Sequence, residues 1–310
     1  MTDPAGPPGE LAWRPGSAGQ IAGLLAGVGY LAGERACGVL WLAAQLGRPV
    51  LVEGPAGTGK TELAVSLAAA TGRRLIRLQC YEGLDEARAL FEWNHSRQLL
   101  RIVADQVSRA SRPGPPGRPG SSGLRAEASV FSEEFLLTRP LLDAIRAAEP
   151  VVLLIDEVDR LDVETEALLL EVLSDYQVSI PELGTITSTQ TPMVFLTSNN
   201  SRELSEALKR RCLYLYIDYP PPEREREIVL SRVPDLDVGL AGQIAGVVQT
   251  LRRLELKKRP SVSETIDWAQ TLFLLGAEQI STDLVIGTLH VLLKHQSDIE
   301  KATAELKKTR

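Results

Sequence analysis

The stretch GPAGTGKT, residues 54–61, has the residue types and spacing that bind the phosphates of a nucleotide. It matches the pattern G-x-x-x-x-G-K-[ST] and lies between an apolar run and a helical pattern, which is the context that this motif requires. We expect backbone N–H groups to face the phosphates, Lys60 to neutralise the β and γ oxygens, and Thr61 to supply a hydroxyl to Mg²⁺. The predicted ATP-binding residues of the loop are Gly54, Pro55, Ala56, Gly57, Thr58, Gly59, Lys60 and Thr61.

An acidic pair, Asp156 and Glu157, ends the apolar run VVLLIDE. Beside a phosphate loop, Asp156 is expected to hold the Mg²⁺ shell with Thr61, and Glu157 to orient and polarise an attacking water. The alternative is an acidic pair that only caps a strand. A glutamate that prepares water favours ATP hydrolysis over phosphoryl transfer to a small molecule, and the sequence has no N-K-x-D run that would read guanine. We expect Asp159 to be a solvated charge.

Further polar groups follow or precede two later apolar runs. The run FLTSNN places Asn199 at a strand end, where its amide is expected to contact the γ-phosphate or the water. Asn200 is the second choice for this role, and an ordinary turn residue is the alternative. Arg210 and Arg211 precede the run LYLYI. Each is either a surface charge or an arginine finger that stabilises transition-state charge in a neighbouring subunit's site.

The composition is that of a globular protein of about two domains, with 310 residues, 44% apolar and 24% charged. The net charge of −6 argues against nucleic acid as the main ligand. Cys37, Cys80 and Cys212 are far apart, so we expect buried thiols of a cytoplasmic protein. Residues 18–33 carry no charge, but they are too short and glycine-rich for a membrane span and are expected to lead into the first helix.

Apolar periodicity divides the chain into an α/β part and a helical part. Residues 1–19, rich in Pro and Gly, are expected to be a disordered tail, and residues 30–46 a helix. Five continuous apolar runs separated by helical segments predict a three-layer α/β domain over residues 20–222, with a parallel sheet between helices. The predicted strands are residues 49–53, 75–79, 151–155, 193–197 and 213–217.

Two segments interrupt the α/β pattern, and a third change ends it. Residues 81–124 are too long for one crossover helix and contain the Pro-Gly-rich run 111–123, so we predict an insertion. The alternative is a surface loop that has no function. Residues 176–189 are expected to form a β-hairpin around Pro-Glu-Leu-Gly. Only helical patterns follow three consecutive prolines, which predicts a stiff hinge and a helical lid domain over residues 223–310.

The order of phosphate loop, IDE strand, TSN strand end, paired arginines and helical lid resembles the AAA+ ATPases, from about residue 30 to the C-terminus. Within that superfamily the chain is similar to the MoxR group. It is most similar to the subset that resembles the CoxD protein of carbon monoxide dehydrogenase maturation. The stretches that carry this resemblance are GRPVLVEGPAGTGKTELA, LQCYEGLDEARALFEW, LLIDEVDRLD, PMVFLTSNNSRELSEALKRRCLYLYIDYP and RPSVSETIDWAQTL.

The resemblance implies an AAA+ P-loop αβα domain with a helical lid, assembled into a hexameric ring whose active sites are shared between neighbours. The insertion and the hairpin would face the central channel. By position, Asn199 matches the sensor 1 residue and Arg211 the arginine finger, while Arg259 is the candidate for the ATP-binding sensor 2 arginine of the lid. The implied partners are a protein with a von Willebrand factor A domain and a client protein complex or metalloenzyme that the ring activates.

These inferences favour an ATP-driven chaperone that remodels a client, with the lid moving about the hinge as the γ-phosphate is lost. A slowly hydrolysing scaffold, which presents different surfaces when ATP is bound, is the alternative from another class. A nucleic-acid motor is a third hypothesis. The acidic balance and the lack of a basic patch interleaved with aromatic residues argue against it.

Overall fold

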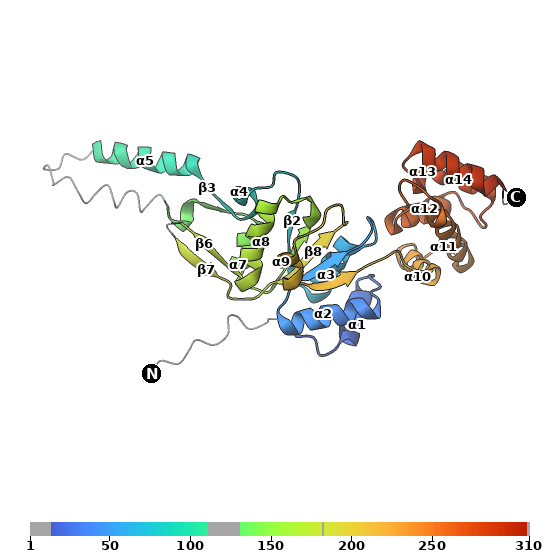
Figure 1. Cartoon of the computed structure of the whole chain (residues 1–310), viewed down its shortest axis with the longest axis horizontal. Coiled ribbons are helices and arrows are strands. Elements are labelled where there is room, and N and C mark those ends of the chain that lie inside the picture. Colours follow the sequence, from blue (N-terminus) through green and yellow to red (C-terminus); the bar gives the residue numbers. More distant parts are fainter. Residues whose placement is uncertain (1–13, 111–130, 182, 309–310) are drawn as a thin grey trace.

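A sheet of five parallel strands, in the order β2-β5-β8-β1-β9, forms the centre of the molecule. The structure is a computed structural model and describes residues 14–110, 131–181 and 183–308. A C-terminal helical domain lies at one end of the molecule and helix α5 projects from the other (Figure 1). The predicted fold class is therefore confirmed. The strands of the sheet are β1 (Val50–Glu53), β2 (Arg74–Gln79), β5 (Val151–Asp156), β8 (Met193–Ser198) and β9 (Leu213–Tyr216).

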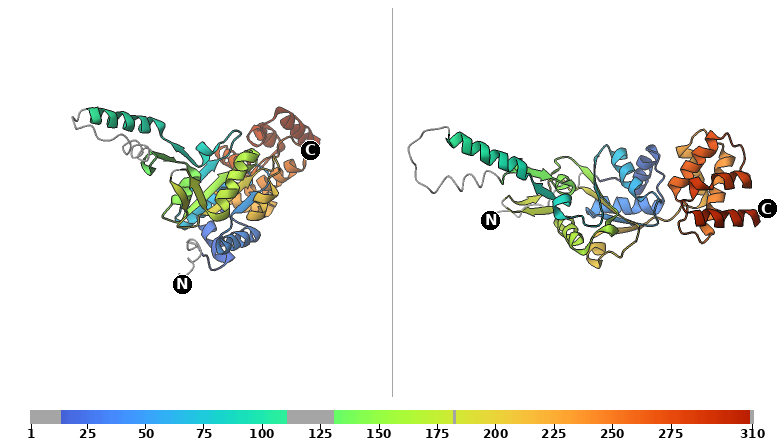
Figure 2. Two further views of the ribbon diagram at one scale, coloured as in Figure 1. Left: turned by 60° about the vertical axis from the view of Figure 1, so that its left-hand side comes forward. Right: turned by 90° about the horizontal axis from the view of Figure 1, so that it is seen from above.

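Helices cover both faces of the sheet, which makes the domain three layers deep (Figure 2). One face carries α1 (Ala18–Gly27), α2 (Glu34–Leu46) and α3 (Lys60–Thr71). The other carries α7 (Pro140–Arg146), α8 (Val163–Asp175) and α9 (Glu206–Arg211). Because both faces are covered, every residue of β5 and β8 is buried, as the continuous apolar runs predicted.

Helix α1 begins inside the segment that was predicted to be a disordered tail, which corrects that prediction from residue 14 onward. The Pro15 carbonyl accepts hydrogen bonds from Trp41 Nε1 at 3.1 Å and from Gln45 Nε2 at 3.0 Å. The glycines of α1 weaken an isolated helix, but the full burial of Ile21 and Leu25 in the core outweighs this cost. Residues 1–13 lie outside the described part of the chain.

The segment after β2 is a structured insertion. It runs through α4 (Glu86–Ala89) and β3 (Phe91–Trp93) into α5 (His95–Ala110), and returns through η1 (Glu133–Phe135) and β4 (Leu136–Thr138). Strand β4 pairs with β3 in antiparallel fashion, so the insertion returns to the domain beyond the predicted boundary at residue 124. The Pro-Gly-rich run 111–123 lies outside the described residues.

A β-hairpin joins α8 to β8. Strands β6 (Gln177–Ile180) and β7 (Gly184–Thr187) pair in antiparallel fashion within the segment where a hairpin was expected. Val178 and Ile180 are buried in the same core cluster as α7 and α8. The hairpin is therefore held by packing on one side, and its other side carries exposed polar residues such as Ser179 and Thr185.

The C-terminal helical domain has a core of its own. Trp268 is fully buried at its centre and donates a hydrogen bond from Nε1 to Thr288 Oγ1 at 2.8 Å. No helix in the described ranges is long and apolar enough to cross a membrane. The last helix, α14, was not predicted because its sequence is mostly polar. The helices are α10 (Pro222–Arg232), α11 (Val238–Arg253), α12 (Val262–Leu274), α13 (Thr282–Leu292) and α14 (Gln296–Lys308).

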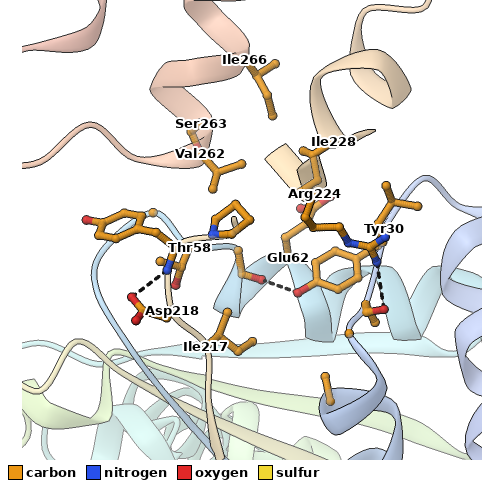
Figure 3. A pocket seen from close by; sticks show the side chains of 18 of the residues that line it. Tyr30, Thr58, Glu62, Ile217, Asp218, Arg224, Ile228, Val262, Ser263 and Ile266 are labelled. Atoms are coloured by element: carbon orange, nitrogen blue, oxygen red, sulfur yellow. Dashed lines mark hydrogen bonds between the residues drawn. The ribbon is translucent and has the colours of Figure 1, made fainter. Parts of the chain in front are cut away.

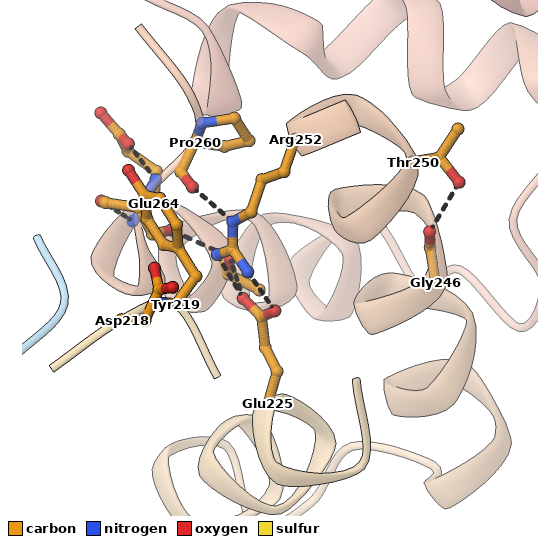
Figure 4. Close-up of polar contacts among 10 residues, drawn as sticks. Asp218, Tyr219, Glu225, Gly246, Thr250, Arg252, Pro260 and Glu264 are labelled. Carbon is orange, nitrogen blue, oxygen red and sulfur yellow. Dashed lines mark hydrogen bonds and ion pairs between the residues drawn. The ribbon is translucent and has the colours of Figure 1, made fainter. Parts of the chain in front are cut away.

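A buried ion pair lies beside residues 217–221, the segment between β9 and the first helix of the helical domain where the hinge was predicted (Figure 4). Arg252 of α11 donates to both carboxylate oxygens of Glu225 of α10, at 2.6 and 2.7 Å, and from Nε to the Pro260 carbonyl at 2.8 Å. The Tyr219 ring of the hinge lies 4.5 Å from the Arg252 guanidinium carbon. Thr265 of α12 donates to Glu225 at 2.8 Å. One guanidinium therefore ties the hinge, α10, α11 and α12 together.

The three cysteines, Cys37, Cys80 and Cys212, are free and buried. Burial raises the pKa of Cys80 and of Cys212 to about 12, so both thiols stay protonated at neutral pH. They act as small apolar side chains in the core, as the sequence led us to expect.

Candidate functional site

The phosphate loop joins the carboxyl end of β1 to the N-terminus of α3, where the first N–H groups of the helix point outward. Gly54, Gly57 and Gly59 have positive φ angles of 153°, 74° and 89°. A Cβ atom at Gly54 would lie 1.9 Å from the Ile217 carbonyl oxygen, so only glycine lets the loop pass the end of β9. The loop therefore has the backbone of an anion-binding turn.

Lys60 folds back onto this loop. Its Nζ donates hydrogen bonds to the carbonyls of Gly54 at 2.8 Å and Pro55 at 2.6 Å. Burial lowers the pKa of Lys60, although the nearby Asp159 and Asp156 carboxylates oppose the shift. Because an anion adds a full Coulomb attraction that a neutral carbonyl lacks, an anion in the loop would be a better partner for this ammonium group.

Asp156 lies against the first turn of α3, although β8 separates its strand from β1. Its Oδ1 accepts hydrogen bonds from Thr61 Oγ1 at 2.9 Å and from Thr197 Oγ1 at 2.5 Å, and its side chain is only 4% exposed. Helix α3 packs across β8 and β5, which carries Thr61 to the end of β5. The two residues predicted to bind Mg²⁺ are therefore in contact with each other.

The donor atoms at this point fit Mg²⁺. Thr61 Oγ1 and the Asp156 carboxylate are hard oxygen ligands, which this ion prefers. Among the described residues, no group of three or more His, Cys, Asp or Glu side chains could hold a metal ion alone. A site with so few protein ligands suits Mg²⁺, because this ion usually takes its remaining ligands from water and from substrate phosphates.

Glu157 directly follows Asp156 and has a left-handed backbone, with φ 58° and ψ 48°. Its N–H donates to Thr197 Oγ1 at 2.9 Å, so the Thr197 hydroxyl bridges both acidic residues. The Glu157 carboxylate forms an ion pair with Arg160 Nε at 2.7 Å, and its side chain is 33% exposed. A non-glycine residue in this backbone region costs roughly 1–3 kcal/mol, and such residues cluster at functional sites.

Asp159 is buried, which corrects its prediction as a solvated charge. Its Oδ2 accepts hydrogen bonds from the Ser201 N–H at 2.9 Å and the Ser201 hydroxyl at 2.6 Å. Burial acts to raise the pKa of Asp159, but the hydrogen bonds from Ser201 outweigh it, so the pKa lies below its usual value. Asp159 therefore fixes the loop that carries Asn199, which is partly exposed, and Asn200, which is exposed with φ 58°.

Arg77 of β2 reaches Asp156 from the opposite side, a contact that was not predicted from the sequence. Strand β2 pairs with β5 so that Gln79 stands opposite Asp156. An Arg77 guanidinium nitrogen forms an ion pair with Asp156 Oδ2 and donates to Gln79 Oε1 at 2.8 Å. The only local sign of this role is that Arg77 and Gln79 alternate with apolar residues near the end of the strand.

Arg210 and Arg211 are exposed at the end of α9, just before β9. Strand β9 begins opposite Val50, the first residue of β1, so both arginines lie at the end of the sheet away from the chain's own phosphate loop. Arg48 Nε donates to the Arg211 carbonyl at 3.1 Å, and Arg211 Nε donates to Ser174 Oγ at 2.5 Å. The structure does not bring either arginine to the site on the same chain.

The helical domain touches the phosphate loop through the start of α12. The Val262 N–H donates to the Gly57 carbonyl at 3.1 Å, and a Cβ atom at Gly57 would lie 2.2 Å from Ser261 Cβ. Ser261 and Glu264 form a reciprocal capping box that fixes this first turn. Arg259, the predicted sensor 2 residue, is exposed two residues before Ser261.

A cavity of about 790 Å³ lies between the sheet domain and the helical domain, next to Gly57 and Gly59 (Figure 3). Its walls include the Tyr30 ring, whose hydroxyl donates to the Gly59 carbonyl at 3.3 Å, and Val262. Ion pairs and hydrogen bonds close one side, because Arg232 of α10 binds Glu62 of α3 at 2.7 Å. The mostly apolar walls and the adjoining loop suit a ligand with a flat apolar part and an anionic part.

Comparison with known proteins identifies relatives of this chain. Residues 49–212, more than half of the chain, match the family model described as AAA domain (dynein-related subfamily). The denitrification regulatory protein NirQ of Stutzerimonas stutzeri is 25% identical over 228 residues, which cover 71% of this chain and 70% of that protein.

Solved structures of Thermotoga maritima RuvB are similar to this chain over most of its length. A RuvB mutant aligns with a TM-score of 0.48 and 20% identity, covering 90% of this chain and 73% of that chain. The RuvB Holliday junction branch migration motor aligns with a TM-score of 0.44 and 18% identity, covering 91% of this chain and 74% of that chain.

Proposed function

The chain belongs to the dynein-related subfamily of AAA domains, and from this premise we propose that it hydrolyses ATP to remodel a client protein. In this proposal it is a chaperone of the MoxR group, similar to the CoxD-like subset. Its subunits form a hexameric ring, and each site takes one arginine from a neighbour. The helical domain acts as a lid over the nucleotide.

The contact between Thr61 and Asp156 carries this proposal. It places a hydroxyl, a carboxylate and the phosphate loop at one point, with Glu157 as the next residue. Bound Mg²⁺ would neutralise charge on the phosphates. Lys60 would leave the two loop carbonyls for the phosphate oxygens, and Glu157 would accept a proton from the attacking water.

The cavity between the two domains supports ATP as the ligand. It adjoins the phosphate loop and has room for a base and a ribose, which the apolar walls around Tyr30 and Val262 would enclose. Asn199 is proposed to contact the γ-phosphate or the water, because its loop lies beside Glu157 and is held by Asp159. Arg259 remains the proposed lid arginine, since it precedes the first turn of α12.

The position of Arg211 supports a shared site. At the end of the sheet away from its own phosphate loop, Arg211 is exposed, and its guanidinium is held by Ser174. If it takes part in ATP hydrolysis, an arginine in this place acts on a neighbouring subunit's site, as an arginine finger supplied in trans does. Such sharing requires an oligomer, and we propose the ring that the family resemblance implies.

The proposed client is a protein complex or metalloenzyme, reached with a partner that carries a von Willebrand factor A domain. The similarity to a denitrification regulatory protein supports a regulatory role for this chain. The insertion and the hairpin β6–β7 are the proposed client-facing parts. Three free, buried cysteines support a cytoplasmic location, where thiols stay reduced.

Two variants test the ATPase function against one control. Lys60→Ala should weaken binding of a fluorescent ATP analogue by more than about tenfold, because it removes the ammonium partner of the phosphates. Glu157→Gln should bind ATP normally and hydrolyse it about a hundredfold or more slowly than the wild type. Lys301→Ala, at an exposed lysine of α14, should behave like the wild type. Tight binding by Lys60→Ala, or normal hydrolysis by Glu157→Gln, would contradict the assigned roles.

The ion pair between Glu157 and Arg160 favours one alternative, a slowly hydrolysing scaffold. The ion pair keeps the Glu157 carboxylate on Arg160 instead of on an attacking water, so in this hypothesis ATP would persist and the ATP-bound surface would be the functional state. Client activation by Glu157→Gln separates the two hypotheses. A scaffold still activates its client when hydrolysis is blocked, whereas a remodelling chaperone does not.

A further inference from the structure

Arg77 and the proposed metal site compete for one carboxylate. Asp156 is almost fully buried, and its two oxygens have different partners. Oδ1 accepts from two neutral hydroxyls, Thr61 and Thr197, whereas Oδ2 is bound by the Arg77 guanidinium. Arg77 is therefore the cation that contacts the Asp156 carboxylate directly in this structure.

A buried carboxylate requires such a partner. An ionised group removed from water without a counter-charge is strongly destabilising, and hydroxyl donors alone do not supply that charge. Lys60, the cation of the phosphate loop, donates to the Gly54 and Pro55 carbonyls instead. The pairing with Arg77 therefore stabilises the protein when no metal ion is bound.

The same pairing opposes metal binding. A divalent ion at Thr61 and Asp156 would lie close to the guanidinium, and two cations on one buried carboxylate repel each other. Arg77 has access to solvent, because its side chain is 50% exposed. The guanidinium can therefore leave Asp156 for the solvent.

We infer that Arg77 is a stand-in cation for Mg²⁺. It holds the Asp156 carboxylate before the metal ion binds, and the metal ion must displace it. This inference rests on the proposed function, since it concerns the metal that accompanies ATP. It makes Arg77 a positioning residue of the site and gives its removal two effects of opposite sign. The variant unfolds more easily when no metal ion is added, and it binds the metal ion more tightly.

The test measures Mn²⁺ binding by electron paramagnetic resonance, with a non-hydrolysable ATP analogue present, together with thermal unfolding of the nucleotide-free protein. Arg77→Met removes the charge and keeps the length of the side chain. Arg77→Lys keeps the charge. Arg74→Met is the matched control, because Arg74 lies on the same strand and forms ion pairs with Asp143 at 2.8 Å and Glu149 at 3.2 Å, away from the site.

We expect Arg77→Met to bind Mn²⁺ about tenfold more tightly than the wild type, the order expected for one charge-assisted hydrogen bond, and to unfold at a lower temperature without nucleotide. Arg77→Lys and Arg74→Met should keep the wild-type affinity for Mn²⁺. Unchanged or weaker Mn²⁺ binding by Arg77→Met would overturn the inference, because a purely structural arginine would change only the stability. If the wild type binds no ATP analogue at all, the proposed function fails and this inference fails with it.

Discussion

The Val262 N–H donates a hydrogen bond to the Gly57 carbonyl, so the first turn of α12 rests directly on the phosphate loop. Gly57 has no side chain to hold the two apart, and its φ of 74° lies in the region that favours glycine. Any change in the loop on nucleotide binding therefore reaches the helical domain without an intermediary.

Gly57→Ala should detach the helical domain from the phosphate loop. The new Cβ atom would lie 2.2 Å from Ser261 Cβ, and the positive φ adds about 1–2 kcal/mol of strain. Gly72→Ala is the control, because Gly72 has a similar φ of 65° with nothing within 4 Å of a Cβ. Small-angle X-ray scattering should show a larger radius of gyration for Gly57→Ala alone. Equal radii for the two variants would mean that the contact does not hold the domain.

Arg252→Met should destabilise the helical domain by about 3–5 kcal/mol, because it leaves the Glu225 carboxylate buried without a partner. Adding Glu225→Gln should recover part of this loss, since no buried charge then remains. Arg253→Met, at the exposed neighbour on α11, should change stability little. Urea unfolding of all variants measures these differences. If Arg252→Met alone is as stable as Arg253→Met, the ion pair contributes nothing to stability.

Asp159→Asn should lower the stability at neutral pH by about 1–3 kcal/mol, because a neutral amide accepts the Ser201 hydrogen bonds less strongly. The pKa of Asp159 is below its usual 3.8, so its ionised form contributes stability above that pH and loses the contribution as the pH falls through the folded-state pKa. The difference from wild type should therefore shrink in acid. Thermal unfolding between pH 7 and pH 3 measures it, with the exposed Asp235→Asn as control. A difference that stays constant with pH would contradict the assigned ionisation.

Mixing two inactive variants, Glu157→Gln and Arg211→Ala, should restore ATP hydrolysis. In a mixed ring the first variant lends its arginine to the intact Glu157 site of the second. Recovery well above the sum of the separate rates would establish shared sites. Replacing Arg211→Ala by Arg210→Ala in the mixture identifies which arginine acts. If subunit exchange is verified and neither mixture recovers, the shared site is wrong.

The strands and the phosphate loop were predictable because their signals are local. A continuous apolar run specifies a buried strand wherever it lies in the sheet, and the loop motif needs only its flanking strand and helix. Lys60, Thr61 and Asp156 could be named for the same reason. Helix α1 was missed because the burial of Ile21 and Leu25 overrides the weak helix propensity of its glycines.

Contacts between distant strands could not be predicted from local patterns. Arg77 meets Asp156 only because β2 lies next to β5, and the whole insertion separates these strands in the chain. The burial of Asp159 likewise depends on the loop after β8, which brings Ser201 to it. Sequence periodicity reports which face of an element is buried, but not which other element covers it.

Tryptophans in different parts of the molecule give each part an optical reporter of its own. Trp41 contacts the Pro15 carbonyl in the sheet domain, Trp93 packs edge-on against Phe131 in the insertion, and Trp268 is sealed inside the helical domain. Indole fluorescence depends on the polarity around the ring. Variants that keep one of these tryptophans would let ligand-driven motion be followed separately in each part of the protein, without attached dyes.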